Sequence, residues 1–176
     1  MSIRKADGFA LIDVIFVCGI IGLLSSIALP RLVLAKQAAG AASAIGTMRT
    51  VASAELTFAL TCGSGFYAPS LTVLGTPPPG SNEPYIGGGM GQADMIQRSS
   101  YTFRLEGVPY GGAPPTCNGL GAGEAAQGYA AAADPTEPTN PRFFGTNSNA
   151  QLWEHNATLW IDMPEVGEPP VGIVLR

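Results

Sequence analysis

Residues 9–30 read FALIDVIFVCGIIGLLSSIALP, and the expected architecture follows from this segment. Its only charged side chain is Asp13. At 1.5 Å per residue, a helix of this length extends about 30 Å, which is the thickness of the hydrocarbon core of a bilayer. The segment therefore predicts a membrane-spanning helix, with the short basic flank of Arg4 and Lys5 on the cytoplasmic side.

A secretory signal peptide is the alternative interpretation of the same segment. Its apolar run is longer than the roughly 7–15 residues of a typical signal peptide, and no small-x-small cleavage motif follows before Pro30 and Arg31. The flanking charges do not decide the question, because Arg31 and Lys36 follow the other end of the run. The length and the missing motif favour a retained anchor.

Asp13 requires an explanation of its own, because an ionised carboxylate in a membrane helix costs about 2.5–3.5 kcal/mol on insertion scales. If the chain is cut after Gly8, Phe9 gains a free amine four residues before Asp13, which places opposite charges on one helix face. In a staggered bundle the amine also reaches the carboxylate of a neighbouring chain, so the pair would fix the register between subunits. The alternative is that Asp13 lies at the membrane interface and stays hydrated.

The sequence KADGFALIDV at residues 5–14, followed by an apolar run that ends in ALP, resembles the prepilin signal of type IV pilins and type II secretion pseudopilins. The resemblance implies that a prepilin peptidase cuts between Gly8 and Phe9 on the cytoplasmic side of the inner membrane. It also implies that the peptidase methylates the new amine of Phe9. The family normally has glutamate where this chain has Asp13, whose shorter side chain keeps the charge but has less reach.

The same resemblance assigns assembly roles to Asp13, Gly22 and Pro30. Family helices have a glycine and a proline at the positions of Gly22 and Pro30. Proline removes one backbone hydrogen bond and clashes with the carbonyl of Ser26, which allows the helix to bend or melt locally.

The helix is expected to continue beyond the membrane segment, because residues 31–61 contain no proline and have apolar side chains at spacings of three or four. One helix is therefore predicted from Phe9 to about Thr61, some 80 Å long. Its second half is expected to bury a stripe against a sheet, as the resemblance to pilins implies. The predicted stripe consists of Ala38, Ala42, Ile45, Met48, Ala52, Leu56 and Ala59.

The rest of the chain predicts a small antiparallel sheet. Residues 63–91 are rich in Gly, Pro, Ser and Asn and are expected to form a loop. Tyr101, Phe103 and Leu105 alternate with polar residues, which indicates a half-buried strand. Short, turn-rich connections favour a meander, and the fold class is α+β and pilin-like. Further strands are expected at residues 128–133, 142–145, 150–154, 158–161 and 171–175.

These elements predict three parts: a prepilin leader at residues 1–8, a transmembrane and assembly helix at 9–30, and an extracytoplasmic pilin-like head at 31–176. Only 12% of the 176 residues are charged and the net charge is -4, so no basic stripe is available for nucleic acid. The partners that the resemblance implies are the prepilin peptidase, identical and related pilin subunits, and the inner membrane.

Three cysteines are placed unevenly: Cys18 lies in the apolar run, whereas Cys62 and Cys117 lie in the polar part. A disulfide between the last two would stabilise the fold by about 4 kcal/mol outside the cytoplasm. Two unpaired, buried thiols are the alternative. No zinc site is expected, because the only histidine is His155 and there is no Cys-x-x-Cys motif.

No catalytic residue, cofactor or metal is expected. The sequence GGGMG at residues 87–91 lacks the Lys-Ser or Lys-Thr of a phosphate loop and predicts a flexible loop. Asp162, Glu165 and Glu168 offer three carboxylates to a calcium ion that needs six to eight oxygens, so a solvated acidic turn is favoured. The expected function is that of a structural subunit of a type IV pilus or a secretion pseudopilus. The alternative is a membrane-tethered extracytoplasmic binding module that does not polymerise.

Overall fold

The computed structural model describes residues 11–175. The contacts divide the chain into two compact units between Ala39 and Gly40, and the helix α1 (Leu11–Thr61) contributes to both. The predicted leader and the predicted cleavage site at Gly8 and Phe9 lie outside the described residues. The second unit contains the rest of α1 and a sheet, and is called the head below.

In the head, α1 buries one stripe of side chains at spacings of three and four. The predicted stripe is confirmed only in part: Met48 and Ala59 are buried, but Ala42 and Leu56 are exposed and Ala52 is half-buried. Alanines lie all around this part of the helix, so the apolar pattern alone did not fix which side meets the sheet. The buried positions are Ala41, Ala44, Met48, Val51, Ala54, Glu55, Phe58 and Ala59.

The end of α1 at Thr61 confirms the prediction. The backbone N–H groups of Cys62 and Gly63 both donate to the carbonyl oxygen of Phe58, at 2.9 and 2.8 Å. These two bonds satisfy a carbonyl in the last turn that would otherwise lack a partner.

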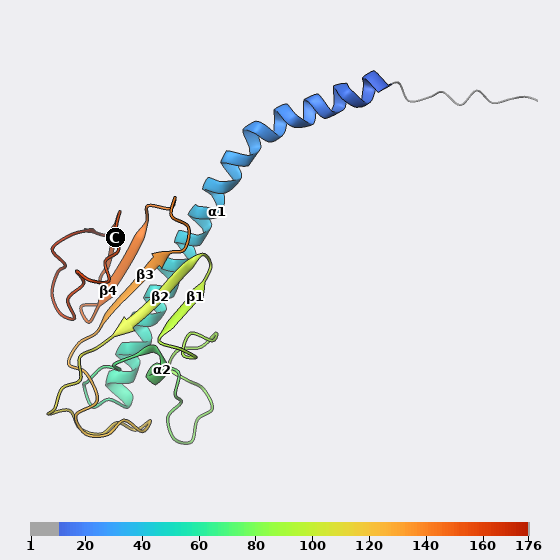
Figure 1. The fold of residues 1–176 in the computed structure, drawn as a ribbon. Coiled ribbons are helices and arrows are strands. Elements are labelled where there is room, and N and C mark those ends of the chain that lie inside the picture. The colour runs from blue at the N-terminus through green and yellow to red at the C-terminus, as the bar shows by residue number, and fades with distance from the viewer. Residues whose placement is uncertain (1–10, 176) are drawn as a thin grey trace, which may run out of the picture. The chain divides into compact units, whose positions relative to one another are not determined.

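The sheet has six antiparallel strands in chain order, as Figure 1 shows for the first four labelled strands. This order confirms the predicted meander and the α+β class. The strands are β1 (Met95–Arg98), β2 (Tyr101–Glu106), β3 (Ala130–Pro135), β4 (Phe143–Asn147), β5 (Leu152–His155) and β6 (Ile173–Val174).

The structure differs from the predicted set of strands in two places. Strand β1 was not predicted, and it joins β2 through Ser99 and Ser100, whose φ angles of 50° and 64° are those of a type I′ turn. The predicted strand at 158–161 is wrong. The hydroxyl of Thr158 donates to Asp134 at 2.9 Å and accepts from the N–H of Trp160 at 3.2 Å, so a local turn replaces the strand ladder.

The predicted loop at 63–91 contains a short helix, α2 (Leu71–Leu74), whose two leucines are buried in the core. Gly75 and Gly91 are also more constrained than expected. A Cβ atom on Gly75 would lie 2.4 Å from the carbonyl oxygen of Gly91, so the backbones cross too closely for any side chain. The segment that ends at Gly91 is therefore part of the packed head.

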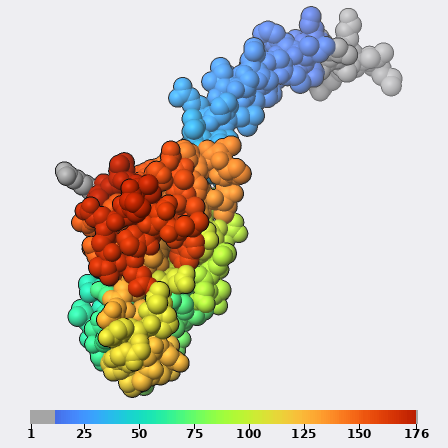
Figure 2. Space-filling model, turned by 60° about the vertical axis from the view of Figure 1, so that its left-hand side comes forward, coloured from blue at the N-terminus to red at the C-terminus, as the bar shows by residue number. Residues whose placement is uncertain are grey.

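The sheet buries side chains on both faces. Adjacent strand residues point to opposite faces: Leu152 packs in the core with α1, whereas Trp153 packs with Leu159 and Met163 on the other face. The C-terminal segment therefore forms a third layer, and it covers much of the head surface in the view of Figure 2, where it is red. The strand side chains on the α1 face are Tyr101, Phe103, Leu105, Ala131, Ala133, Phe144 and Leu152.

Candidate functional site

The first unit exposes the apolar side chains of α1. Ile12, Phe16 and Leu23 are 72%, 68% and 71% exposed. By length and composition this helix could cross a membrane, and none of its most apolar window is buried. Soluble monomers rarely expose contiguous apolar surface of this extent, so the segment is a candidate for contact with lipid or with other proteins.

Asp13 lies exposed in the first turn of α1. A carboxylate in this position is favoured by the partial positive charge at the helix N-terminus. The amine of Phe9, its predicted partner, lies outside the described residues, so their pairing stays a prediction.

The helix α1 is continuous through Gly22 and Pro30. A Cβ atom on Gly22 would meet nothing within 4 Å, so packing inside this chain does not require glycine there. Pro30 has no N–H to donate to the carbonyl of Ser26, and the hydroxyl of Ser26 donates to the carbonyl of Leu23 at 2.8 Å. The assembly roles of both residues stay predictions.

Cys62 and Cys117 form a disulfide, which is the pair expected from the sequence, with Cα atoms 4.9 Å apart. The bond ties the C-terminal end of α1 to the connection between β2 and β3. Cys18, in the apolar part of α1, is free and exposed.

Glu55 is a buried carboxyl group that the sequence reasoning missed. It is 0% exposed, and its Oε2 atom accepts a hydrogen bond from the N–H of Ala68 at 2.9 Å. No described group bonds to its Oε1 atom. Burial raises the pKa of Glu55 well above its usual value, although the Ala68 bond opposes the shift. Its spacing from Val51 and Phe58 was the signal that could have placed it on the buried stripe.

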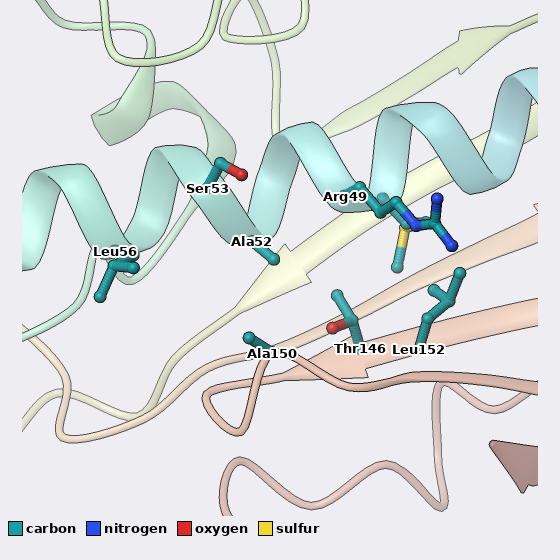
Figure 3. Close-up of a pocket in the computed structure, with 8 residues that line it drawn as sticks. Arg49, Ala52, Ser53, Leu56, Thr146, Ala150 and Leu152 are labelled. Carbon is teal, nitrogen blue, oxygen red and sulfur yellow. The ribbon is translucent and has the colours of Figure 1, made fainter. Parts of the chain in front are cut away.

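A groove of about 360 Å³ lies on the head between α1 and the hairpin of β4 and β5 (Figure 3). Met48, Thr146 and Leu152 are its buried residues, and Leu56 is 52% exposed at its edge. Arg49 is exposed and forms no ion pair with a described carboxylate. The groove is thus apolar with one cation at its margin. Its remaining lining residues are Ala52, Ser53 and Ala150.

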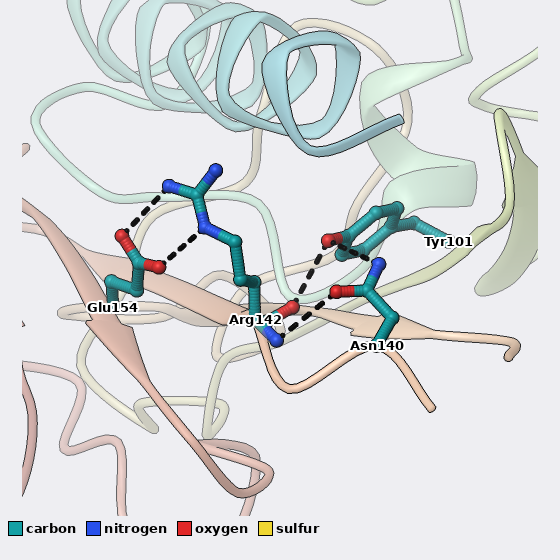
Figure 4. A network of polar contacts seen from close by, with 4 residues as sticks. All are labelled: Tyr101, Asn140, Arg142 and Glu154. Carbon is teal, nitrogen blue, oxygen red and sulfur yellow. Dashed lines mark hydrogen bonds and ion pairs between the residues drawn. The ribbon is translucent and has the colours of Figure 1, made fainter. Parts of the chain in front are cut away.

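A polar network lies at the start of β4, at the end away from the groove, and joins this strand to β2 and β5 (Figure 4). Arg142 forms a forked ion pair with Glu154, at 2.6 and 3.0 Å. The hydroxyl of Tyr101 donates to the carbonyl of Arg142 at 3.0 Å and accepts from Asn140 at 3.1 Å. A surface depression next to this network contains His155, and none of the described residues that line it is a serine or cysteine nucleophile.

The acidic turn near the C-terminus is held by protein donors. The side-chain amide of Asn147 donates to the carbonyls of Pro164 and Gly167, at 2.9 and 2.7 Å. The carboxylate of Glu165 accepts from the N–H of Val108. Within residues 11–175, no three histidine, cysteine or acidic side chains converge on a position that could hold a metal ion.

In comparisons with known proteins, no family model, no curated protein and no solved structure matches this chain. The structure itself therefore carries the functional argument. It consists of an exposed apolar N-terminal helix whose second part packs on a six-stranded antiparallel sheet, with a disulfide at the end of that helix.

Proposed function

We propose that this chain is a structural subunit of a type IV pilus or a type II secretion pseudopilus. A single observation supports this most strongly: the first part of α1 exposes its apolar side chains on all sides, whereas the second part belongs to a folded head. Such a segment needs lipid before assembly and other helices after it. The chain is thus first a single-pass protein of the inner membrane, and then part of an extracellular pilus or a periplasmic pseudopilus.

The proposed maturation begins with cleavage between Gly8 and Phe9 by prepilin peptidase. Methylation of the Phe9 amine follows, and the amine pairs with Asp13 in the assembled subunits. The Cys62–Cys117 disulfide supports an extracytoplasmic head, because disulfides persist in oxidising compartments. Assembly is the function in this proposal, and no residue has a catalytic role.

Shearing of the cell surface tests the proposal. We expect the chain in the sheared filament fraction, beginning at Phe9, with about 14 Da of added mass from one methyl group. Recovery of the chain only as a membrane monomer would favour a tethered binding module. Retention of Met1 would contradict the predicted maturation.

Asp13 provides the sharper genetic test. Asp13→Ala removes the partner of the Phe9 amine, so the chain should still insert and be cut after Gly8, while filament yield falls sharply because an unpaired buried charge costs several kcal/mol. Asp13→Glu keeps the charge and should assemble at least as well as the wild type. Filament yields are compared at equal levels of processed subunit, and normal assembly of Asp13→Ala would exclude this role for the carboxylate.

A further inference from the structure

Ile161 is the most exposed large apolar side chain of the described head, at 84%. The next residue, Asp162, is also exposed and has no described cation as a partner. An apolar side chain beside a free carboxylate is thus presented to solvent on the C-terminal segment.

The turn that presents Ile161 is anchored on both sides. Leu159 and Met163 are buried against the sheet, and the N–H of Met163 donates to the carbonyl of Leu159 at 2.9 Å. The ring of Trp160 lies under the guanidinium of Arg104, whose carbon atom is 5.2 Å from the ring centroid. Because these contacts already fix the turn, binding to a partner would cost it little conformational entropy.

The groove beside α1 has the complementary chemistry. Its walls at Ala52 and Leu56 are apolar, and Arg49 provides an unpaired cation at the margin. Two hydroxyl groups line the groove: that of Thr146 already donates to the carbonyl of Gln151 at 2.7 Å, and that of Ser53 lies on an exposed residue. The groove therefore suits an apolar side chain next to a carboxylate better than it suits a polar small molecule.

The two features cannot meet within one chain, because the sheet lies between them. Leu152 lines the groove on the α1 face, whereas its neighbour Trp153 packs with Leu159 and Met163 on the other face. A contact between groove and turn must join two chains.

We propose that Ile161 of one chain inserts into the groove beside α1 of a second copy, and that Asp162 pairs there with Arg49. The contact uses two different surfaces of one molecule, so a bound pair of copies still has one free groove and one free turn. A heterologous contact of this kind repeats into an open helical filament when its rotation does not close a ring. This inference rests on the proposed function and assigns the head surfaces that would join its subunits.

Cross-linking in intact cells tests the contact directly. The full-length chain with Cys18→Ala receives Ser53→Cys in the groove and Ile161→Cys on the turn, and a short bismaleimide is added. We expect a ladder of dimers, trimers and longer species from the double variant. Neither single variant should give a ladder, and co-expression of the two single variants should give dimers only.

Charge reversal provides an independent test. Arg49→Glu should lower filament yield about tenfold, because it faces a carboxylate in the neighbouring chain. Asp162→Arg alone should have a similar effect, and the double variant should recover most of the yield. Arg98→Glu is the matched control, since Arg98 is exposed and lies outside the groove.

The outcomes separate this inference from the proposed function. Filaments that form normally without a ladder, or without rescue by the double charge reversal, would overturn the contact and leave the filament proposal intact. Cross-linked dimers from Ser53→Cys alone would indicate a symmetric interface and would also overturn it. Wild-type chains that form no filament would overturn both.

Discussion

Two parts of α1 have opposite environments. Around Phe16 the large apolar side chains are exposed, whereas Phe58 is completely buried against the sheet. The first part is apolar on all sides and meets no covering surface of this chain, whereas the second part has one apolar stripe that the sheet covers. Apolar residues of the second part stabilise the head, and those of the first part are available to lipid or to other chains.

Replacement of one phenylalanine in each part should produce the largest difference in the free energy of unfolding of the head. Phe58→Ala should lower the free energy of unfolding of the head by about 3–5 kcal/mol, because it removes a buried ring and leaves a cavity. Phe16→Ala should leave it unchanged within about 0.5 kcal/mol. Urea unfolding of the full chain in detergent, followed by the fluorescence of buried Trp153, measures both. Equal losses would show that the two parts of the helix are not energetically distinct.

The disulfide should matter next most. Cys62→Ala combined with Cys117→Ala should lower the free energy of unfolding of the head by about 2–4 kcal/mol, since it frees the unfolded chain from a closed loop. Cys18→Ala is the matched control and should have no effect on the head. Labelling of the native, unreduced protein should modify neither Cys62 nor Cys117, and rapid reaction of both would show that the head does not depend on their pairing.

Glu55 should give the buried part of α1 a dependence on pH that the exposed part lacks. Since the folded pKa is raised, the folded head holds a proton above pH 4.5 that the unfolded chain has lost, and stability falls as the pH rises toward the folded pKa. The slope should approach about 1.4 kcal/mol per pH unit. Glu55→Gln should flatten it, because the amide does not titrate, while its oxygen can still accept from Ala68 N–H. Indistinguishable pH profiles from urea unfolding of the two proteins would rule out this titration.

Within the buried part of α1, the smallest effect on stability is expected at Leu56, which lies on its exposed side. Leu56→Ala should change the free energy of unfolding of the head by no more than about 0.5 kcal/mol. Val51→Ala, on the buried stripe, is the comparison and should cost more. A large loss at Leu56 would mean that the groove wall supports the head itself.

Much of this architecture followed from sequence, for identifiable reasons. The helix and its end at Thr61 were predictable because proline is absent between 31 and 61 and turn residues follow at once. The meander was predictable because the connections from β3 to β4 and from β4 to β5 are short, although longer segments separate β2 from β3 and β5 from β6. The Cys62–Cys117 pairing followed from the position of Cys18 in the apolar run.

Other features depend on tertiary contacts that no local pattern contains. Strand β1 escaped prediction because Ser99 and Ser100 adopt left-handed angles without the usual Asn-Gly signal. Glu55 was missed because an acidic residue is normally assigned to the exposed side of a helix. The groove and the Ile161 turn lie on opposite faces of the sheet, and this placement depends on the fold of the whole head.

The loop that Cys62 and Cys117 close has a mechanical consequence. A pulling force on a chain lengthens it by unravelling segments, and each extended residue contributes about 3.3–3.6 Å. The two cysteines are separated by 55 positions in the sequence. While the disulfide is intact, a pulling force therefore cannot extend this segment, whose contour length is roughly 190 Å. Under load, tension that enters through α1 would cross directly from Cys62 to Cys117, and the enclosed segment, including β1 and β2, would bear none of it along its backbone.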